Sequence, residues 1–187
     1  MQPPIHLAIS WLVGHRLSER RDRRLVTWAG VLPDLDGLSL LFGVGAYSTY
    51  HHVISHGIVA VVVIAGMWSA FARDKVKTAL LSLAAFHIHL LCDLVGSGAQ
   101  GEPWPITYLW PFSNREIIFP YGWDLASPQN AFVWLGAIGW TILIAMKQGR
   151  TFAEAFLPAR ADEAIVATLR KLASRLAGKA RFSGRAG

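Results

Sequence analysis

Two histidines, a cysteine and an aspartate interrupt one of the most apolar stretches of this chain, FHIHLLCDLVG at residues 86–96. An unpaired polar or charged side chain in an apolar medium costs several kcal/mol, so a segment built only for packing would avoid them. His89 and Asp93 are four residues apart, which on a helix places both side chains on one face. A metal ion would remove the cost of burial, because it compensates the carboxylate charge and occupies the imidazole lone pair.

Three further motifs carry the same residue types. They are His6 in the first apolar segment, PDLDG with Asp34 and Asp36, and HHVISHG with His51, His52 and His56. Taken alone, each motif has a plainer interpretation: a hydrogen bond between helices for the 89/93 pair, a turn for PDLDG, a polar helix start for HHVISHG, and an interfacial or core histidine at position 6. Convergence of all four at one place favours a metal site over these alternatives.

The composition is typical of a membrane protein. Hydrophobic residues make up 53% of the 187 positions and charged residues 16%, whereas soluble domains average about 25% charged. The formal net charge of +6 could indicate nucleic acid or anionic lipid, but the basic residues lie in short clusters between apolar segments, so we expect no nucleic-acid partner. The single cysteine, Cys92, excludes an intramolecular disulfide.

Five apolar segments must position the motifs. They cover residues 3–14, 25–44, 53–72, 78–95 and 130–146. Segment 53–72 is the clearest, since it contains no Asp, Glu, Lys or Arg and as a helix it is long enough to cross about 30 Å of hydrocarbon.

The connecting segments complete the expected fold. The Gly/Pro/Trp-rich stretch 96–129 predicts an irregular loop, and 151–180 predicts a basic amphipathic helix. The sequence therefore predicts an all-α fold, an integral membrane bundle of four to five helices, with no cleavable signal peptide. We expect a membrane-embedded domain at 1–147 and a basic cytoplasmic tail at 148–187.

The basic residues predict an orientation. With antiparallel segments, the clusters at 15–24 and 73–77 and the basic residues after 146 fall on one side, and only Arg115 among the 18 basic residues lies opposite. By the positive-inside rule the basic side and the C-terminus are cytoplasmic. The His and Asp motifs then meet at the non-cytoplasmic end, and we expect no polar residues to continue from there to the basic side.

The donors suit a first-row divalent metal, because imidazole and carboxylate without a thiol cluster fit Zn²⁺, Mn²⁺ or Fe²⁺. The candidate ligands are His6, Asp34, Asp36, His51, His56, His89 and Asp93. His87 points elsewhere on its helix, and His15 lies on the basic side, so we expect neither to be a direct ligand.

In their order along the chain, the motifs resemble the YdjM-like family of LexA-regulated, membrane-bound, metal-dependent hydrolases. That family has an early histidine, then PDxD, HRGxTHS, HxxxD and a loop with WPF-like residues. Here they read His6, PDLDG (33–37), HHVISHG (51–57), HIHLLCD (87–93) and LWPFS (109–113), and the resemblance covers about residues 1–145. The chain departs from the family at His52, which stands in place of an arginine, and at Gly37, Ser55 and Gly57.

This family in turn is similar to the helical zinc-dependent phospholipase C and P1 nuclease group, which implies zinc first, with manganese or iron as alternatives. By that likeness His56, His89, Asp93 and either Asp34 or Asp36 hold the main ion. His6 would add to a second ion that shares Asp93.

The resemblance implies a multi-pass protein of the bacterial inner membrane that hydrolyses a phosphoester or lipid-type substrate at the periplasmic face. The metal would activate water, with Asp34 or Asp36 as the general base. Membrane lipids are the expected partners, and the aromatic residues of 96–129 belong at the membrane interface. Two alternatives are a metal-stabilised scaffold or stress-response protein without turnover, and a divalent-metal transporter.

Overall fold

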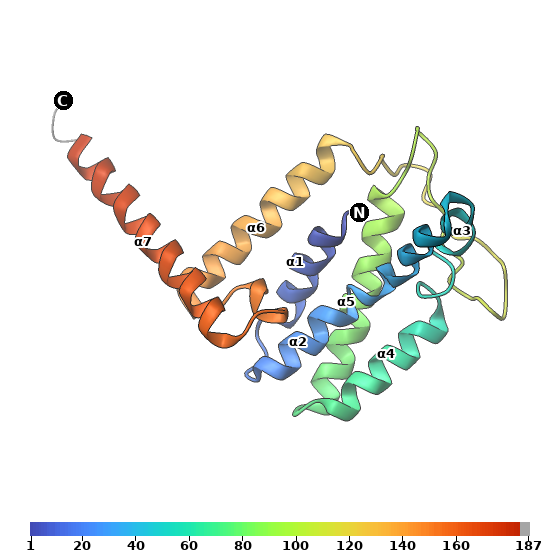
Figure 1. The fold of residues 1–187 in the computed structure, drawn as a ribbon, viewed down its shortest axis with the longest axis horizontal. Coiled ribbons are helices and arrows are strands. Elements are labelled where there is room, and N and C mark those ends of the chain that lie inside the picture. The colour runs from blue at the N-terminus through green and yellow to red at the C-terminus, as the bar shows by residue number, and fades with distance from the viewer. Residues whose placement is uncertain (184–187) are drawn as a thin grey trace.

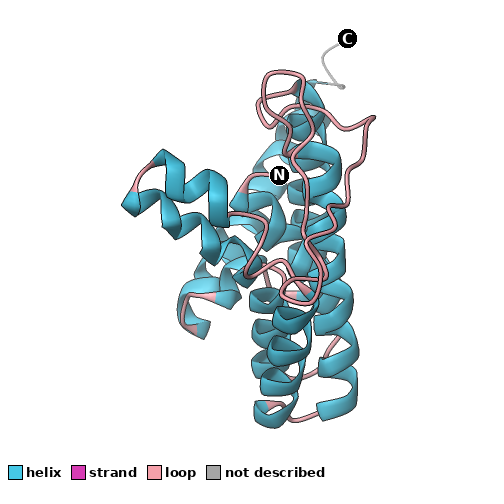
Figure 2. Ribbon diagram, turned by 90° about the vertical axis from the view of Figure 1, so that its right-hand side faces the viewer, coloured by secondary structure: helices cyan, strands magenta, loops and turns pink. Residues whose placement is uncertain are grey.

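Helix α5 (Lys75–Gly96) lies at the centre of the fold, in contact with α1, α2 and α4. It begins where the Asp74 side chain accepts a hydrogen bond from the backbone N–H of Lys77, which satisfies one of the free donors of the first turn. The computed structural model describes residues 1–183, and over that range the protein is all-α, with isolated β-bridges in place of a sheet (Figures 1 and 2). The expectation of an all-α fold is confirmed.

Helices α1 (Pro3–Gly14) and α2 (Arg20–Ala29) pack against each other and against α5. Gly30, directly after α2, permits this close approach, because a Cβ atom there would lie 1.9 Å from Oγ of Ser10 on α1. The carbonyl oxygen of Gly30 also faces α5, where it lies 2.9 Å from Nδ1 of His89.

The chain bends after α2 into the 3-10 helix η1 (Leu32–Phe42), which begins at LPDLDG. The two helices meet at 48°, and Pro33 explains the break because proline removes a backbone donor and disfavours a helical residue before it. A short helix, α3 (Val44–Tyr50), follows and packs on η1.

Helix α4 (Ile58–Phe71) is shorter than the sequence predicts for 53–72. Its 14 residues correspond to roughly 21 Å at 1.5 Å per residue, so α4 alone does not cross a bilayer core. Residues before 58 are held out of the helix by bonds to neighbouring segments: the N–H of His52 donates to Asp36 (3.0 Å) and Oγ of Ser55 donates to the carbonyl of Pro33. The prediction of a span beginning at 53 is wrong for this reason.

Between α5 and α6 (Pro128–Gln148) the chain forms an irregular loop, as predicted for 96–129. Asn130 ties the loop to both helices, because its side-chain amide donates to the carbonyls of Gly96 (2.8 Å) and Leu125 (2.9 Å) and accepts from the indole of Trp123 (2.9 Å). The loop leaves the end of α5 and passes beside α3, where Trp104 contacts Tyr47 (Figure 1).

After α6 the chain forms a second 3-10 helix, η2 (Phe152–Ala155), and then the long helix α7 (Ala159–Ser183), which extends away from the other helices (Figure 1). The prediction of one amphipathic helix over 151–180 is therefore wrong at its start. The cause is Glu154, which is buried against α1 and α2 and holds η2 there.

Two helices, α5 and α6, are long and apolar enough to cross a membrane. The bent pair α2 and η1 would make a third span if the two act as one. The bundle thus has two to three candidate spans, with α1 and α4 as shorter apolar helices beside them.

The basic regions meet at one end of the bundle. Asp22, near the start of α2, accepts hydrogen bonds from the backbone of Arg73 and Asp74 in the turn before α5, at 2.9 Å each. η2 contacts the same end of α2, because Arg23 pairs with Glu154. Asp93 lies near the opposite end of α5.

The buried face of α5 carries polar residues toward both ends, with Ala85 and Phe86 between them. It carries Thr78, Ser82, His89 and Asp93, and the hydroxyls of Thr78 and Ser82 are buried without a hydrogen-bond partner. Buried polar side chains therefore occur again toward the basic end, contrary to the expectation from sequence.

Candidate metal centre

Three imidazoles surround one carboxylate oxygen at the end of α5. Oδ2 of Asp93 lies 2.8 Å from Nε2 of His89, 3.5 Å from Nε2 of His56 and 3.8 Å from Nε2 of His52. All four side chains are buried, and the Nε2 atoms of His89 and His56 are 3.2 Å apart. Carboxylate oxygen and imidazole nitrogen at these separations are the donors of a first-row metal site.

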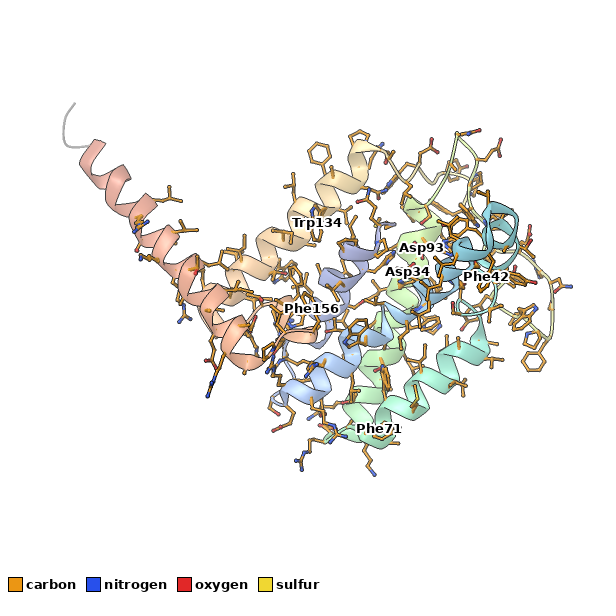
Figure 3. All side chains as sticks on the ribbon, viewed as in Figure 1. Asp34, Phe42, Phe71, Asp93, Trp134 and Phe156 are labelled. Atoms are coloured by element: carbon orange, nitrogen blue, oxygen red, sulfur yellow. The ribbon has the colours of Figure 1, made fainter. Side chains whose placement is uncertain are left out.

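The potential ligand atoms form two groups that share Asp93. In each group the atoms lie within 4.8 Å of one another: His6, Asp34, His89 and Asp93 in one, and His52, His56 and Asp93 in the other. Figure 3 shows Asp34 and Asp93 close together, although they come from η1 and α5. Within the first group, Nε2 of His6 lies 3.1 Å from Oδ1 of Asp93, and Nε2 of His89 lies 3.8 Å from Oδ1 of Asp34.

Second partners fix the imidazole rings. Nδ1 of His89 donates to the carbonyl of Gly30 (2.9 Å), and Nδ1 of His56 donates to Oδ2 of Asp36 (2.9 Å). A carbonyl only accepts, so Nδ1 of His89 carries the proton and its Nε2 presents a lone pair to the cluster. Metal-bound histidines are oriented in this way by a carbonyl or carboxylate on the far nitrogen.

His52 holds an unusual backbone conformation, with φ at 65° in the left-handed region. Such a residue costs about 1–3 kcal/mol unless its surroundings hold it, and strained residues gather at functional sites. Here its N–H bonds Asp36 and its carbonyl accepts from the N–H of Thr107 (3.2 Å). The strain turns the His52 ring toward Asp93.

The electrostatics of the two loop histidines differ. Burial lowers the pKa of His52 well below 6.5, and the adjacent His56 lowers it further, so His52 is a neutral imidazole. Burial also acts to lower the pKa of His56, but the hydrogen bond to Asp36 and the negative charges of Asp36 and Asp93 outweigh it and raise the value to about 9. A bound cation would replace the proton of His56, since metal ligation requires the neutral ring.

The residues present fit a divalent ion, as their unsatisfied atoms indicate. Oδ2 of Asp93, Oδ2 of Asp34, Nδ1 of His6 and Nδ1 of His52 are buried without a hydrogen-bond partner. Buried polar groups in native proteins are nearly always paired, so the unpaired oxygens of the two carboxylates beside Nε2 of His89 indicate a ligand that they share.

A pocket of about 290 Å³ opens onto the cluster. Asp34, His52 and Asp93 contribute to its wall, together with the rings of Tyr47 and Trp104. The amino group of Met1 also reaches this side, where it bonds Asp93 and Ser97. The side chain of Asp34 is 16% exposed and that of Asp93 1%, so Asp34 faces the entrance and Asp93 the interior.

The structure brings together five of the predicted ligands, namely His6, Asp34, His56, His89 and Asp93. The two others, Asp36 and His51, lie beside the cluster: Nδ1 of His51 donates to Oδ1 of Asp36 (2.7 Å). Asp36 thus accepts three hydrogen bonds from residues 51–56 and positions two of their rings.

His52 was not among the predicted ligands. In the family motif an arginine stands at its position, and its role stayed open from the sequence, although its i, i+4 spacing from His56 would place both rings on one helix face. His87 and His15 lie away from the cluster: His87 contacts the Tyr108 hydroxyl (2.9 Å) and the Leu83 carbonyl, and His15 contacts the Leu12 carbonyl.

The family model of the YdjM inner membrane proteins matches residues 1–169 of the chain. The chain belongs to the YdjM family. The resemblance seen in the motifs is thereby confirmed, and it extends beyond residue 145 into α7. The matched segment contains every residue of the two metal-ligand groups.

One curated relative is the inner membrane protein YbcI of Escherichia coli (strain K12). It is 25% identical over 153 residues, which cover 70% of this chain and 88% of the relative. No solved structure is significantly similar to this YdjM-family chain. The likeness to phospholipase C and P1 nuclease stays a prediction from the motifs.

Proposed function

We propose that this YdjM-family protein is a metal-dependent hydrolase of the inner membrane, which cleaves a phosphoester of a lipid or another envelope molecule. The observation that carries the proposal is the arrangement at Asp93: three imidazoles converge on a carboxylate oxygen that has no hydrogen-bond partner, beside a pocket open to the outside. A purely structural ion pair would leave neither the unpaired oxygen nor the opening.

A divalent ion, zinc first, would supply Lewis-acid activation of water and of the phosphoryl group at this place. Asp93 would hold it from α5 with His89, while His56 and His52 would hold it from the loop before α4. His6 and Asp34 would complete the second group of ligands, with Asp93 shared between the two.

The two aspartates proposed as catalytic have different partners. Both carboxylate oxygens of Asp36 accept hydrogen bonds, from the rings of His51 and His56 and from the N–H of His52. Asp36 therefore positions imidazoles. Asp34 keeps Oδ2 free of hydrogen bonds and faces the pocket. We therefore assign Asp34 as the proton acceptor for the attacking water, a role that needs a carboxylate within reach of solvent.

A second pocket favours a substrate with an acyl chain. It has a volume of about 620 Å³, its wall is formed mainly by leucines of η1 with Phe42 and Ile54, and it shares Leu38 with the pocket at the metal centre. A headgroup over Asp34 and Asp93 could thus continue into an apolar groove. Interfacial aromatics such as Trp104 and Tyr47 suit the same headgroup depth.

The orientation follows from the charges. The basic turn before α5, the start of α2 and the η2 segment share one end of the bundle, and the metal centre lies at the other. By the positive-inside rule the metal centre faces the periplasm and α7 lies on the cytoplasmic side. Fusion of a periplasm-dependent reporter after Gly187 should give an inactive reporter, and an active one would reverse the orientation.

The hydrolase proposal is tested by measuring bound metal and substrate hydrolysis on the same purified protein. The purified protein, loaded with Zn²⁺ or Mn²⁺, is screened against phosphomonoesters, phosphodiesters and phospholipids. Asp34→Asn should keep an ion at His52, His56 and Asp93, the group to which Asp34 does not belong, and lose at least about 100-fold in rate, as general-base removal predicts. A wild type that holds its metal and cleaves none of these substrates would favour the scaffold, which the deep burial of His52, His56 and His89 also suits.

A further inference from the structure

A third pocket, lined by arginines and apolar side chains, lies at the basic end of the bundle, between α2 and α4, which run side by side there (Figure 1). Its volume is about 510 Å³, and its wall contains Arg20, Arg21, Arg24, Trp28 and Trp68, with two leucines of 25–32 as an apolar floor. The pocket is separate from the metal centre, because α2 begins on the turn before α5 whereas Asp93 lies near the other end of α5.

Of the three arginines of this pocket only Arg20 has a carboxylate partner among the described residues, with its Nε 3.8 Å from Oε2 of Glu154. Nη2 of Arg20 donates to the carbonyl of Leu157 (2.5 Å), and Nε of Arg24 donates to the carbonyl of Ala155 (3.1 Å). The nearest buried carboxylate, Glu154, is already engaged in two short hydrogen bonds with Arg23. In the part of the chain that the structure describes, neither Arg21 nor Arg24 has an ion pair, so the pocket keeps an excess of positive charge and unused guanidinium donors.

The tryptophans of the pocket add a further N–H donor that has no partner. Nε1 of Trp28 donates to the carbonyl of Ala155 (3.1 Å), whereas Nε1 of Trp68 is buried without a partner in the structure described. An indole N–H only donates, so Trp68 requires an acceptor. The polar atoms that line the pocket are predominantly donors, which is the pattern expected for an anion.

The surroundings indicate which anion. The wall of the pocket is also apolar, because Leu25, Leu32 and the ring of Trp28 contribute to it. Tryptophans beside arginines mark the depth of lipid headgroups, and basic pockets between helices on the cytoplasmic side attract anionic lipids. A free phosphate ion would leave the apolar part of this surface without a partner.

We propose that the pocket formed by Arg20, Arg21, Arg24 and Trp68 binds the phosphate of an anionic phospholipid, with an acyl chain against Leu25, Leu32 and the ring of Trp28. The guanidinium groups and the indole N–H supply hydrogen bonds to the phosphate oxygens, and guanidinium geometry matches phosphate bidentately. This site lies in the leaflet opposite the metal centre, so it anchors and orients the protein and does not depend on hydrolysis.

Lipid binding is measured on the detergent-purified full chain by native mass spectrometry, with phosphatidylglycerol or phosphatidylcholine added. The wild type should bind phosphatidylglycerol at least about tenfold more tightly than phosphatidylcholine, as a charged site predicts. Arg21→Gln/Arg24→Gln should remove most of this preference. Trp68→Phe, which keeps the ring and removes only the N–H, should weaken phosphatidylglycerol binding about threefold, within the range for the net contribution of one hydrogen bond.

The matched control is Arg16→Gln/Lys75→Gln, which removes the same charge from the basic side outside the pocket. It should leave the preference intact. If this control lowers phosphatidylglycerol binding as much as the pocket variant, the attraction is general and the site does not exist. Displacement of the lipid by millimolar inorganic phosphate would equally overturn the proposal, because the site would then recognise a free anion.

Discussion

Charged side chains are buried at both ends of the central helix α5, but the two groups differ in how completely they are paired. At the basic end, Glu154 accepts hydrogen bonds from Arg23 at both oxygens (2.6 and 2.7 Å) and from the indole of Trp11 (2.8 Å). Nη1 of Arg23 in turn donates to the carbonyls of Leu17 and Ser18. At the other end, Asp93 and Asp34 each retain a buried oxygen with no hydrogen bond.

The difference separates a structural network from a binding site. A buried ion pair is tolerated when further hydrogen bonds satisfy the remaining lone pairs and protons, as around Glu154. A buried polar group with only part of its hydrogen bonds made is less stable than apolar side chains of the same shape. Such a group persists where a ligand supplies the missing interaction. We infer that the Arg23–Glu154 pair holds η2 on the bundle, whereas the His/Asp cluster is completed by a metal.

The largest expected effect on stability comes from breaking the complete network. Glu154→Gln leaves the Arg23 guanidinium buried without a counter-charge and should cost about 3–5 kcal/mol in the free energy of unfolding. The metal content of the folded fraction should not change. Chemical denaturation in detergent measures the first quantity and elemental analysis the second.

Glu163→Gln is the matched control for this prediction, because Glu163 is exposed on α7. It should change stability by less than about 0.5 kcal/mol. Equal stability of the two variants would show that the Glu154 network does not hold the fold.

Removal of the metal should have the next largest effect. A ligand that binds only the folded state stabilises it by about 2.7 kcal/mol when its concentration is 100 times Kd. A chelator such as EDTA should therefore lower the thermal midpoint of the wild type and of Glu154→Gln alike. Asp93→Asn has lost a shared ligand, so EDTA should not change its thermal midpoint. A decrease of equal size in this variant would show that Asp93 is not a shared ligand.

A smaller effect is expected at Asp36, which touches the cluster through its imidazoles. Asp36→Asn weakens the acceptors for His51 and His56 and should reduce metal affinity about 10- to 100-fold, as usual for partners of metal-bound histidines. Competition with a fluorescent zinc chelator measures this loss. Complete loss of the metal would instead make Asp36 a direct ligand, as one alternative from the sequence has it.

The smallest effect is expected at His87, two residues from His89 on the same helix. Its ring contacts Tyr108 and the Leu83 carbonyl and no atom of the cluster. His87→Gln should cost about 1 kcal/mol in stability, the net value of one hydrogen bond, and leave metal binding unchanged. Reduced metal binding in this variant would extend the site beyond the residues that the structure brings together.

Parts of this structure follow from local sequence patterns. Helices α5 and α6 could be predicted because each is a long apolar run, and the pairing of His89 with Asp93 follows from their spacing on a helix. The convergence of His6, Asp34 and His56 on Asp93 was predictable from the antiparallel order of the segments. These inferences need only the periodicity of a helix and the direction of the chain.

Other parts depend on contacts between distant segments. The start of α4 at Ile58 is set by bonds from residues 52 and 55 to η1, which no local pattern records. Asp34 and Asp36 have the same chemistry and nearly the same position, so only their partners tell the pocket-facing group from the positioning group. Glu154 is an ordinary acidic residue of a basic segment until the fold places it against Arg23 and Trp11.

Metal content tests the central claim most directly. The wild type, Asp93→Asn and His87→Gln are purified in parallel with Zn²⁺ present, desalted and analysed for Zn, Mn and Fe. The wild type and His87→Gln should retain about one ion or more per chain, since structural and catalytic zinc sites bind tightly at neutral pH, and Asp93→Asn should retain none. A folded wild type that holds no metal, or an Asp93→Asn variant that keeps the same amount, would contradict the assignment of this cluster as a metal centre.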